Sequence, residues 1–235
     1  QLTMSKDSAL RSGFIPSLLR RLRGDATPAQ SAADDTRVTI FLAALQEVSA
    51  KMKADLPLPD LMAVLAEQSV VALEADLALV RLTNLDGEGL VVSGVHGVAP
   101  HRVAGLLGSF SVVTEPFRAL WPGSLAAFDL RGGKPPLLTS AEFSEMVELR
   151  IIPLLVLPLH HRGRLVGRLD LGRVEDVPFS VDDRAAGTVL AGLIASAVAG
   201  SPVGEDRERL AVLEASYEFQ QSIRYLSTAA ETLQN

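Results

Sequence analysis

The chain has 235 residues, of which 48% are hydrophobic, 21% charged and 5% aromatic, and its formal net charge is −6. A chain of this length can bury one large core, and its acidic balance argues against a general nucleic-acid-binding role. It contains no cysteine, which excludes disulfides, thiolate metal sites, a cysteine nucleophile and a thioether-linked chromophore. The lack of cysteine is consistent with a reducing cytoplasm, and no apolar run reaches the roughly 18 residues of a membrane span.

The first 35 residues differ in pattern from the rest of the chain. Residues 14–23 place apolar side chains on one helical stripe and arginines mostly elsewhere, which predicts a short basic amphipathic helix. Residues 24–35 are small and polar and are interpreted as a linker. One apolar stripe without a second anchor would bind a membrane surface only marginally. We therefore expect residues 14–23 to dock on a partner or on a second copy of the chain rather than on a membrane.

Two helices and two strands should follow. The apolar spacing predicts a helix over 36–53 and another over about 59–73. The segment DLALVRLT, residues 76–83, is typical of a strand, and LVVSGVHG is its returning partner after a turn at NLDGEG.

The middle of the chain, residues 98–149, has a weaker pattern. It predicts a short helix near 100–107 and a strand around 110–113. A helix near 124–130 should end at the glycine pair 132–133, followed by a short strand after Pro136. Another helix is expected near 141–148.

The segment from Ile151 to Leu159 is apolar throughout, so it should be a central strand covered on both faces. Pro153 and Pro158 lack ladder donors and are expected at strand ends or bulges. HHRG, residues 160–163, is the predicted hairpin turn. On the returning strand, Leu165, Gly167, Leu169 and Leu171 should share one face, with Val166, Arg168 and Asp170 on the other.

Two helices complete the chain. The first begins with a capping-box variant, in which Ser180 caps the helix and Asp183 reaches back, and it is rich in small residues. The second has neither glycine nor proline after residue 204, and its apolar spacing is that of a coiled-coil seam with one phase shift. Helices at both ends therefore predict self-association, with interface candidates Phe41, Leu45, Val48, Leu190, Leu210, Leu213, Tyr217, Phe219, Ile223 and Leu226. The alternative is a last helix that folds back on its own domain.

These segments resemble the GAF family of sensory modules. GRLVGRLDL, a connector and FSVDD resemble that family's closing half, and the segment from PDLMAVLAEQ to VVSGVHG resembles its first helix and opening strand pair. The resemblance covers roughly 55–200, whereas 98–149 departs from the family pattern. It implies an α+β fold with a central antiparallel sheet of five to six strands flanked by helices. The predicted organisation is residues 1–35 as helix and linker, 36–200 as a GAF-like domain, and 201–235 as a coiled-coil-like helix. A PAS-type sensor module is the alternative.

The resemblance also implies a small-molecule pocket on the sheet face opposite the terminal helices. Its lining candidates are Arg81, Phe110, Phe117, Trp121, Phe128, Phe143, Met146, Arg168 and Asp170. The aromatic residues line a ligand cavity in one interpretation and plug it in the other. The two arginines hold an anionic group in one interpretation. In the other they form a cross-strand salt bridge with Asp170 at a wet edge of the sheet.

The sequence suggests no nucleophilic side chain paired with a general base, so we expect a non-enzyme without cofactor or metal. The prediction is a cytoplasmic sensory or regulatory module that forms homodimers, signals to a protein partner or fused effector, and takes a small-molecule ligand. One alternative is a ligand-free scaffold acting by protein contacts. The other is a haem or redox sensor, for which His96 or His101 would be the iron ligand.

Overall fold

A six-stranded antiparallel sheet organises the computed structural model, which describes residues 28–53, 56–84, 86–120 and 124–200. The strands lie in the order β3-β2-β1-β6-β5-β4, so the predicted antiparallel sheet is confirmed at six strands. The elements are α2 Pro28–Lys53, α3 Leu58–Leu73, β1 Leu77–Thr83, β2 Gly89–His96, α4 Pro100–Leu106, β3 Phe110–Val112, α5 Glu115–Arg118, β4 Ala126–Asp129, the 3-10 helix η1 Leu130–Gly132, α6 Ser140–Glu148, β5 Pro153–His161, β6 Arg164–Gly172 and α7 Val181–Ala199.

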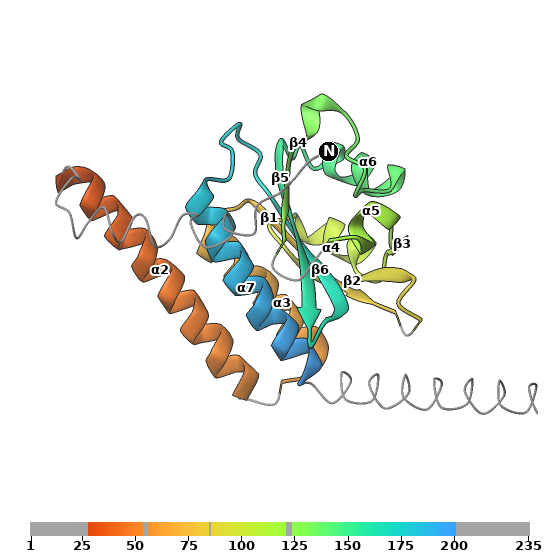
Figure 1. The fold of residues 1–235 in the computed structure, drawn as a ribbon, viewed down its shortest axis with the longest axis horizontal. Helices are drawn as coiled ribbons and strands as arrows, with labels where there is room; N and C mark the ends of the chain where they lie inside the picture. Colours follow the sequence, from red (N-terminus) through yellow and green to blue (C-terminus); the bar gives the residue numbers. More distant parts are fainter. Residues whose placement is uncertain (1–27, 54–55, 85, 121–123, 201–235) are drawn as a thin grey trace, which may run out of the picture.

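The two faces of the sheet are covered differently (Figure 1). Helices α3 and α7 pack on one face, and α2 packs on the outside of these two helices. Apolar side chains of the three helices form a core with leucines of β5 and β6 such as Leu157 and Leu169. The short elements α4, α5, η1 and α6 lie on the opposite face, over a second apolar cluster that includes Leu79, Val156 and Met146. Among the described residues, the structure shows no helix long and apolar enough to cross a membrane.

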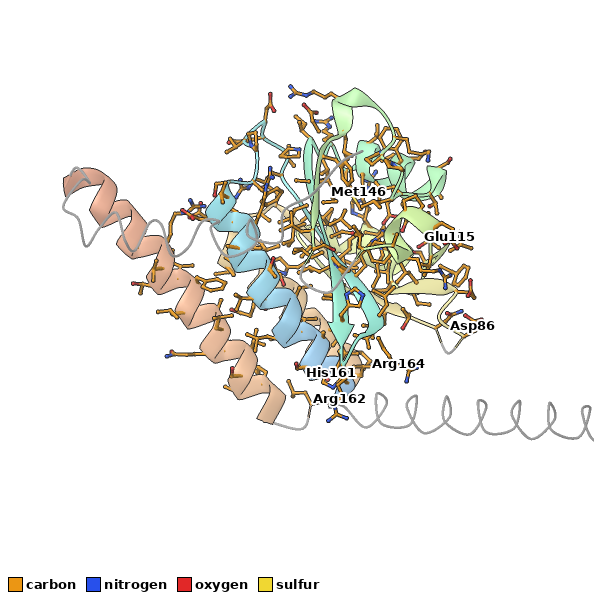
Figure 2. The ribbon with its side chains drawn as sticks, viewed as in Figure 1. Asp86, Glu115, Met146, His161, Arg162 and Arg164 are labelled. Atoms are coloured by element: carbon orange, nitrogen blue, oxygen red, sulfur yellow. The ribbon has the colours of Figure 1, made fainter. Side chains whose placement is uncertain are left out.

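The hairpin of β5 and β6 confirms the main expectation from the sequence. β5 is buried on both faces from Pro153 to Leu159, between β6 and the short strand β4. β4 pairs only with the segment from Pro153 to Val156, so Pro158 lies beyond it, where a missing backbone donor costs no ladder bond to β4. The turn is shorter than predicted. His160 and His161 belong to β5, and only Arg162 and Gly163 turn the chain, both with positive φ as in a type I′ turn (Figure 2).

The side chains of β6 alternate between the two sheet faces as predicted only in the C-terminal half of the strand. Leu169 and Leu171 face the helices, and Arg168 and Asp170 face the opposite side. A register shift between Leu159 and His160 of β5 interrupts this alternation. As a result Val166 packs toward the helices and Leu165 toward the other cluster, the reverse of the expected sides.

Three local predictions were wrong. The helix expected at 36–53 begins at Pro28, because proline suits a first helical turn and the following alanines favour helix over linker. Residues 126–129, expected within a helix at 124–130, form β4, because they pair with the open edge of β5. Residues 136–138 form a turn and a bend rather than a strand. The pairing of β4 with β5 is a long-range contact, and local propensity does not predict it.

Candidate functional site

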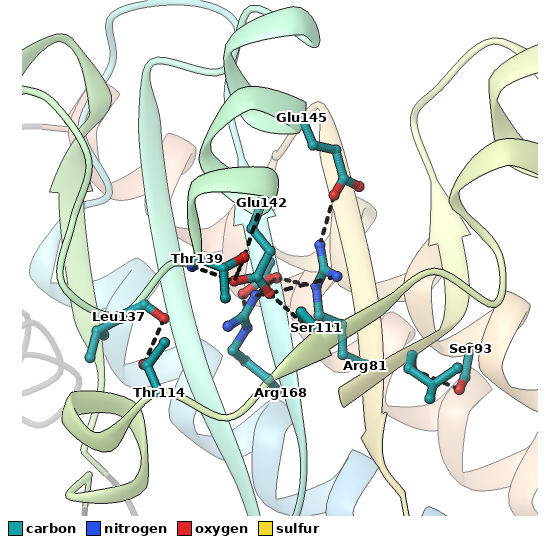
Figure 3. Close-up of polar contacts among 11 residues, drawn as sticks. Arg81, Ser93, Ser111, Thr114, Leu137, Thr139, Glu142, Glu145 and Arg168 are labelled. Carbon is teal, nitrogen blue, oxygen red and sulfur yellow. Dashed lines mark hydrogen bonds and ion pairs between the residues drawn. The ribbon is translucent and has the colours of Figure 1, made fainter. Parts of the chain in front are cut away.

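Five charged side chains meet on the sheet face opposite the three long helices (Figure 3). Arg81 comes from β1, Arg168 and Asp170 come from β6, and Glu142 and Glu145 come from α6. The first four are at most 2% exposed, whereas Glu145 is 18% exposed at the rim. We call this set the ion network. Fully buried charges are rare in proteins and persist only when each has a partner.

The two arginines are positioned by strand register. Arg81 of β1 lies opposite Arg168 of β6 in the antiparallel pairing, which places two like charges side by side. Asp170 lies between them. Its Oδ2 accepts hydrogen bonds from Arg81 Nε and Arg168 Nη2, each over 2.9 Å, and its Oδ1 lies 2.8 Å from Arg168 Nε. One carboxylate therefore joins both guanidiniums on the sheet itself.

Glu142 connects the sheet to α6. Its Oε1 accepts from Arg168 Nη2 over 2.5 Å and from the Ser111 hydroxyl of β3 over 2.8 Å, and lies 3.7 Å from Arg81 Nη1. Its Oε2 accepts from the backbone N–H of Thr139 over 2.8 Å and from the Thr139 hydroxyl over 3.0 Å, which completes the capping box of α6. Burial alone would raise the pKa of Glu142, but the charges of Arg168 and Arg81 outweigh it and lower that pKa.

Glu145 is the surplus charge of the ion network. Two guanidiniums face three carboxylates, so the fully ionised set carries one excess negative charge. Glu145 Oε2 accepts a long hydrogen bond of 3.3 Å from Arg81 Nη2, and its buried Oε1 has no hydrogen-bond partner. Burial raises the pKa of Glu145 despite the charge of Arg81. The pKa values of the two glutamates of α6, three residues apart, are therefore shifted in opposite directions.

The structure brings together the polar residues predicted for a pocket wall. Arg81, Arg168 and Asp170 are in contact, but the salt bridge lies in the interior, not at a wet edge as one interpretation held. Both sheet faces are covered at this point, which the alternation pattern does not reveal. Sequence reasoning missed Glu142, Glu145 and Ser111. The TxxE capping signature at Thr139 was available for Glu142, but only the fold places its carboxylate beside two arginines.

The predicted aromatic lining is divided between interior and surface. Phe117 is buried, with the Arg168 guanidinium 5.4 Å from its ring centre, and Met146, a residue of α6, is fully buried (Figure 2). Phe128 and Phe143 are partly buried against the same cluster. Phe110 does not line a pocket, because it is 59% exposed on edge strand β3, where its ring covers Gly89. Trp121 lies outside the described residues.

The predicted dimer candidates fall into two groups. Val48 and Leu190 are fully buried within the single chain, Phe41 is nearly so, and Leu45 packs partly buried against the same core. These four side chains hold α2 and α7 against the rest of the domain. The other candidates lie outside the described residues, namely Leu210, Leu213, Tyr217, Phe219, Ile223 and Leu226.

The histidines do not gather into a site. His160 and His161 occupy successive positions of β5, His96 ends β2, and His101 lies exposed in α4. Within the described part of the chain, no group of three or more His, Cys, Asp and Glu side chains is placed to hold a metal ion.

A separate pocket of about 200 Å³ lies among residues of other elements. It is lined by the start of β1, the loop between β2 and α4, and the loop between α6 and β5, with Arg102 and Glu148 among its residues. No member of the ion network lines it.

The sheet order and the two helical layers define an α+β domain with the GAF fold. Similar solved structures include the phycoerythrobilin-bound GAF domain of a cyanobacterial phytochrome, 18% identical with a TM-score of 0.57, in an alignment covering 69% of this chain and 96% of that one. The GAF domain of a phosphoenolpyruvate-protein phosphotransferase from Coxiella burnetii is 16% identical with a TM-score of 0.56, and the match covers 72% and 98%. No protein-family model matches the chain, and no curated protein matches it by sequence. These identities establish the fold alone.

Proposed function

We propose that this chain is a non-catalytic sensory or regulatory module of a signalling protein. In this proposal it dimerises through its terminal helices and relays the state of α6 to them. The observation that carries the proposal is the buried ion network, which attaches α6 to β1 and β6 by charge. The GAF fold supports the same role, because similar structures come from a phytochrome and a phosphotransferase.

A second set of contacts supports a route from β6 to the long helices. Arg173, immediately after β6, donates to the carbonyl of Leu73 at the end of α3 over 2.7 Å and to Asp183 Oδ2 at the start of α7 over 3.2 Å. Asp183 Oδ1 also accepts from Arg37 Nη2 of α2 over 2.8 Å. The end of β6 is therefore tied to all three long helices. Arg168 and Asp170 lie on the same strand, a few residues upstream.

The ion network also favours regulation over catalysis. Four of its five groups are almost fully buried and neutralise one another. Glu145, the partly exposed member, is paired with Arg81, and it belongs to no group of three or more His, Cys, Asp and Glu side chains placed to hold a metal ion among the described residues. A general acid or base must reach a substrate, which these groups do not.

The oligomeric state tests the proposal. The full chain should sediment as a dimer, and Ile223→Glu or Leu226→Glu should shift it toward monomer, because each places a charge in the predicted seam. Gln221→Glu adds the same charge off the seam and should leave the dimer intact. A monomeric wild-type chain, or seam variants that dimerise like the control, would contradict dimerisation through this helix.

A ligand-free scaffold is the second candidate, favoured by one observation. Phe117, Met146 and the ion network occupy the space between the sheet and α6 in which a ligand would lie. A thermal-shift screen of metabolites with native mass spectrometry separates the two candidates. Persistent absence of stabilisation and of bound mass would favour the scaffold.

A further inference from the structure

We propose that Arg81, Arg168 and Ser111 form a binding site for one carboxylate group, that Glu142 fills this site as an internal ligand, and that a small monocarboxylate competes with it and releases α6. This inference rests on the proposed function, since it names the ligand class and the regulation of the same site. We call the three residues the carboxylate cradle.

The cradle belongs to the sheet and not to the helix that fills it. Its donors come from three strands, β1, β3 and β6, and all face Glu142 Oε1 (Figure 3). A guanidinium and a hydroxyl within 2.8 Å of one oxygen are typical of a site built for an anion. If α6 moved away, the two guanidiniums would remain in place, because Asp170 holds both of them independently of α6, and Ser111 would remain on β3.

The charge of the sheet specifies the ligand class. Two arginines and Asp170 leave a net charge of +1 on the sheet, which one carboxylate neutralises. Glu142 supplies that carboxylate. Glu145 adds a second one, which gives the set one excess negative charge, and its buried Oε1 has no hydrogen-bond partner. The cradle therefore matches a monocarboxylate better than a dicarboxylate.

The two carboxylate oxygens of Glu142 have different partners, which allows Glu142 to withdraw from the sheet. Its Oε1 contacts only the sheet donors, whereas its Oε2 accepts from Thr139, the N-cap residue of the same helix. Withdrawal from the sheet would therefore leave the capping box of α6 intact. A competing carboxylate has to replace the bonds to Oε1 alone.

Sodium formate is the probe, with sodium chloride at equal ionic strength as the reference. Glu142→Ala empties the cradle, so formate should raise the Tm of this variant by about 3 °C or more above the chloride value, in a saturable way. Wild type, whose cradle is filled, and Glu145→Ala, which removes the same charge at the rim, should shift by less than about 1 °C. Adding Ser111→Ala to Glu142→Ala should reduce the formate effect.

Wild-type protein tests the displacement itself. Formate should increase amide hydrogen exchange in residues 140–148 relative to chloride, with α7 as the internal reference for global opening. This measurement does not depend on whether Glu142→Ala folds. Equal formate shifts in all variants, or unchanged exchange in α6, would overturn the inference. The sedimentation of the dimer is a separate readout, so the proposed function stands or fails independently.

Discussion

Glu142 and Glu145 should respond in opposite directions to the same substitution. Both lie on α6, three residues apart, and glutamine has nearly the same shape and helix propensity as glutamate. Glu142→Gln also keeps a side chain that can serve in a capping box. Neither helix formation nor side-chain volume can therefore explain a difference between the two variants, and only their places in the ion network differ.

The magnitude for Glu142 follows from its contacts. The carboxylate accepts four hydrogen bonds between 2.5 and 3.0 Å, one of them from a guanidinium, and lies 3.7 Å from another. A neutral amide weakens the charged contacts and turns an N–H₂ group toward donors, which costs about 2–4 kcal/mol. For a domain of this size, the Tm should fall by roughly 5–15 °C. Glu145→Gln removes the surplus charge and should raise the Tm by about 1–3 °C.

Thermal and urea unfolding at pH 7 measure both changes, at low and high salt. The loss in Glu142→Gln should depend little on salt, because the pairs it weakens are buried. Equal destabilisation by the two substitutions would refute the charge count. A stable Glu142→Gln would refute the view that this carboxylate holds α6 to the sheet.

Three further predictions test the surrounding structure. Because the pKa of Glu142 is lowered in the fold, its contribution is complete at neutral pH and is lost as pH falls below about 4, so the unfolding free energy should decline less with acid in Glu142→Gln than in wild type. Arg173→Met leaves buried acceptors unpaired and should cost about 2–4 kcal/mol in urea unfolding, whereas Arg131→Met, in an exposed ion pair, should leave the Tm nearly unchanged. Gly167→Ala should cost about 2 kcal/mol or more, because the new Cβ would lie 2.2 Å from a backbone oxygen of β1, whereas Gly192→Ala meets no atom within 4 Å in α7 and should gain about 0.5–1 kcal/mol.

Much of the frame was predictable because it depends on short-range patterns. An unbroken apolar run predicted the doubly buried strand β5, and the spacing of Ser180 and Asp183 predicted a capping box that the structure confirms with bonds of 2.8 and 3.1 Å. Strand β4 was not predictable in this way, since its four residues are extended only because β5 offers them a partner.

The sequence predicted the residues of the ion network that lie on the strands but not those that lie on α6. Polar residues at alternating positions of β6 indicated that Arg168 and Asp170 share a face. Arg81 was predicted beside them, and strand register places it opposite Arg168. What alternation could not reveal is that α6 covers this face and brings Glu142 to it. The exposure of Phe110 has the same origin. A short edge strand leaves one of its faces uncovered, and only the strand order identifies β3 as that edge.

The ion network is an expensive way to fill the space beneath α6. Well-packed apolar side chains of similar volume are often as stable as a buried ion group or more so, because they require no desolvation of charge. This chain uses that solution on its other sheet face, where leucines such as Leu155 and Leu171 pack against the long helices. If α6 were attached by apolar packing alone, a solute could not replace any single group. Because Glu142 attaches α6, a solute can replace its carboxylate. The charged attachment therefore fits the regulatory role proposed above for α6, because it can be exchanged.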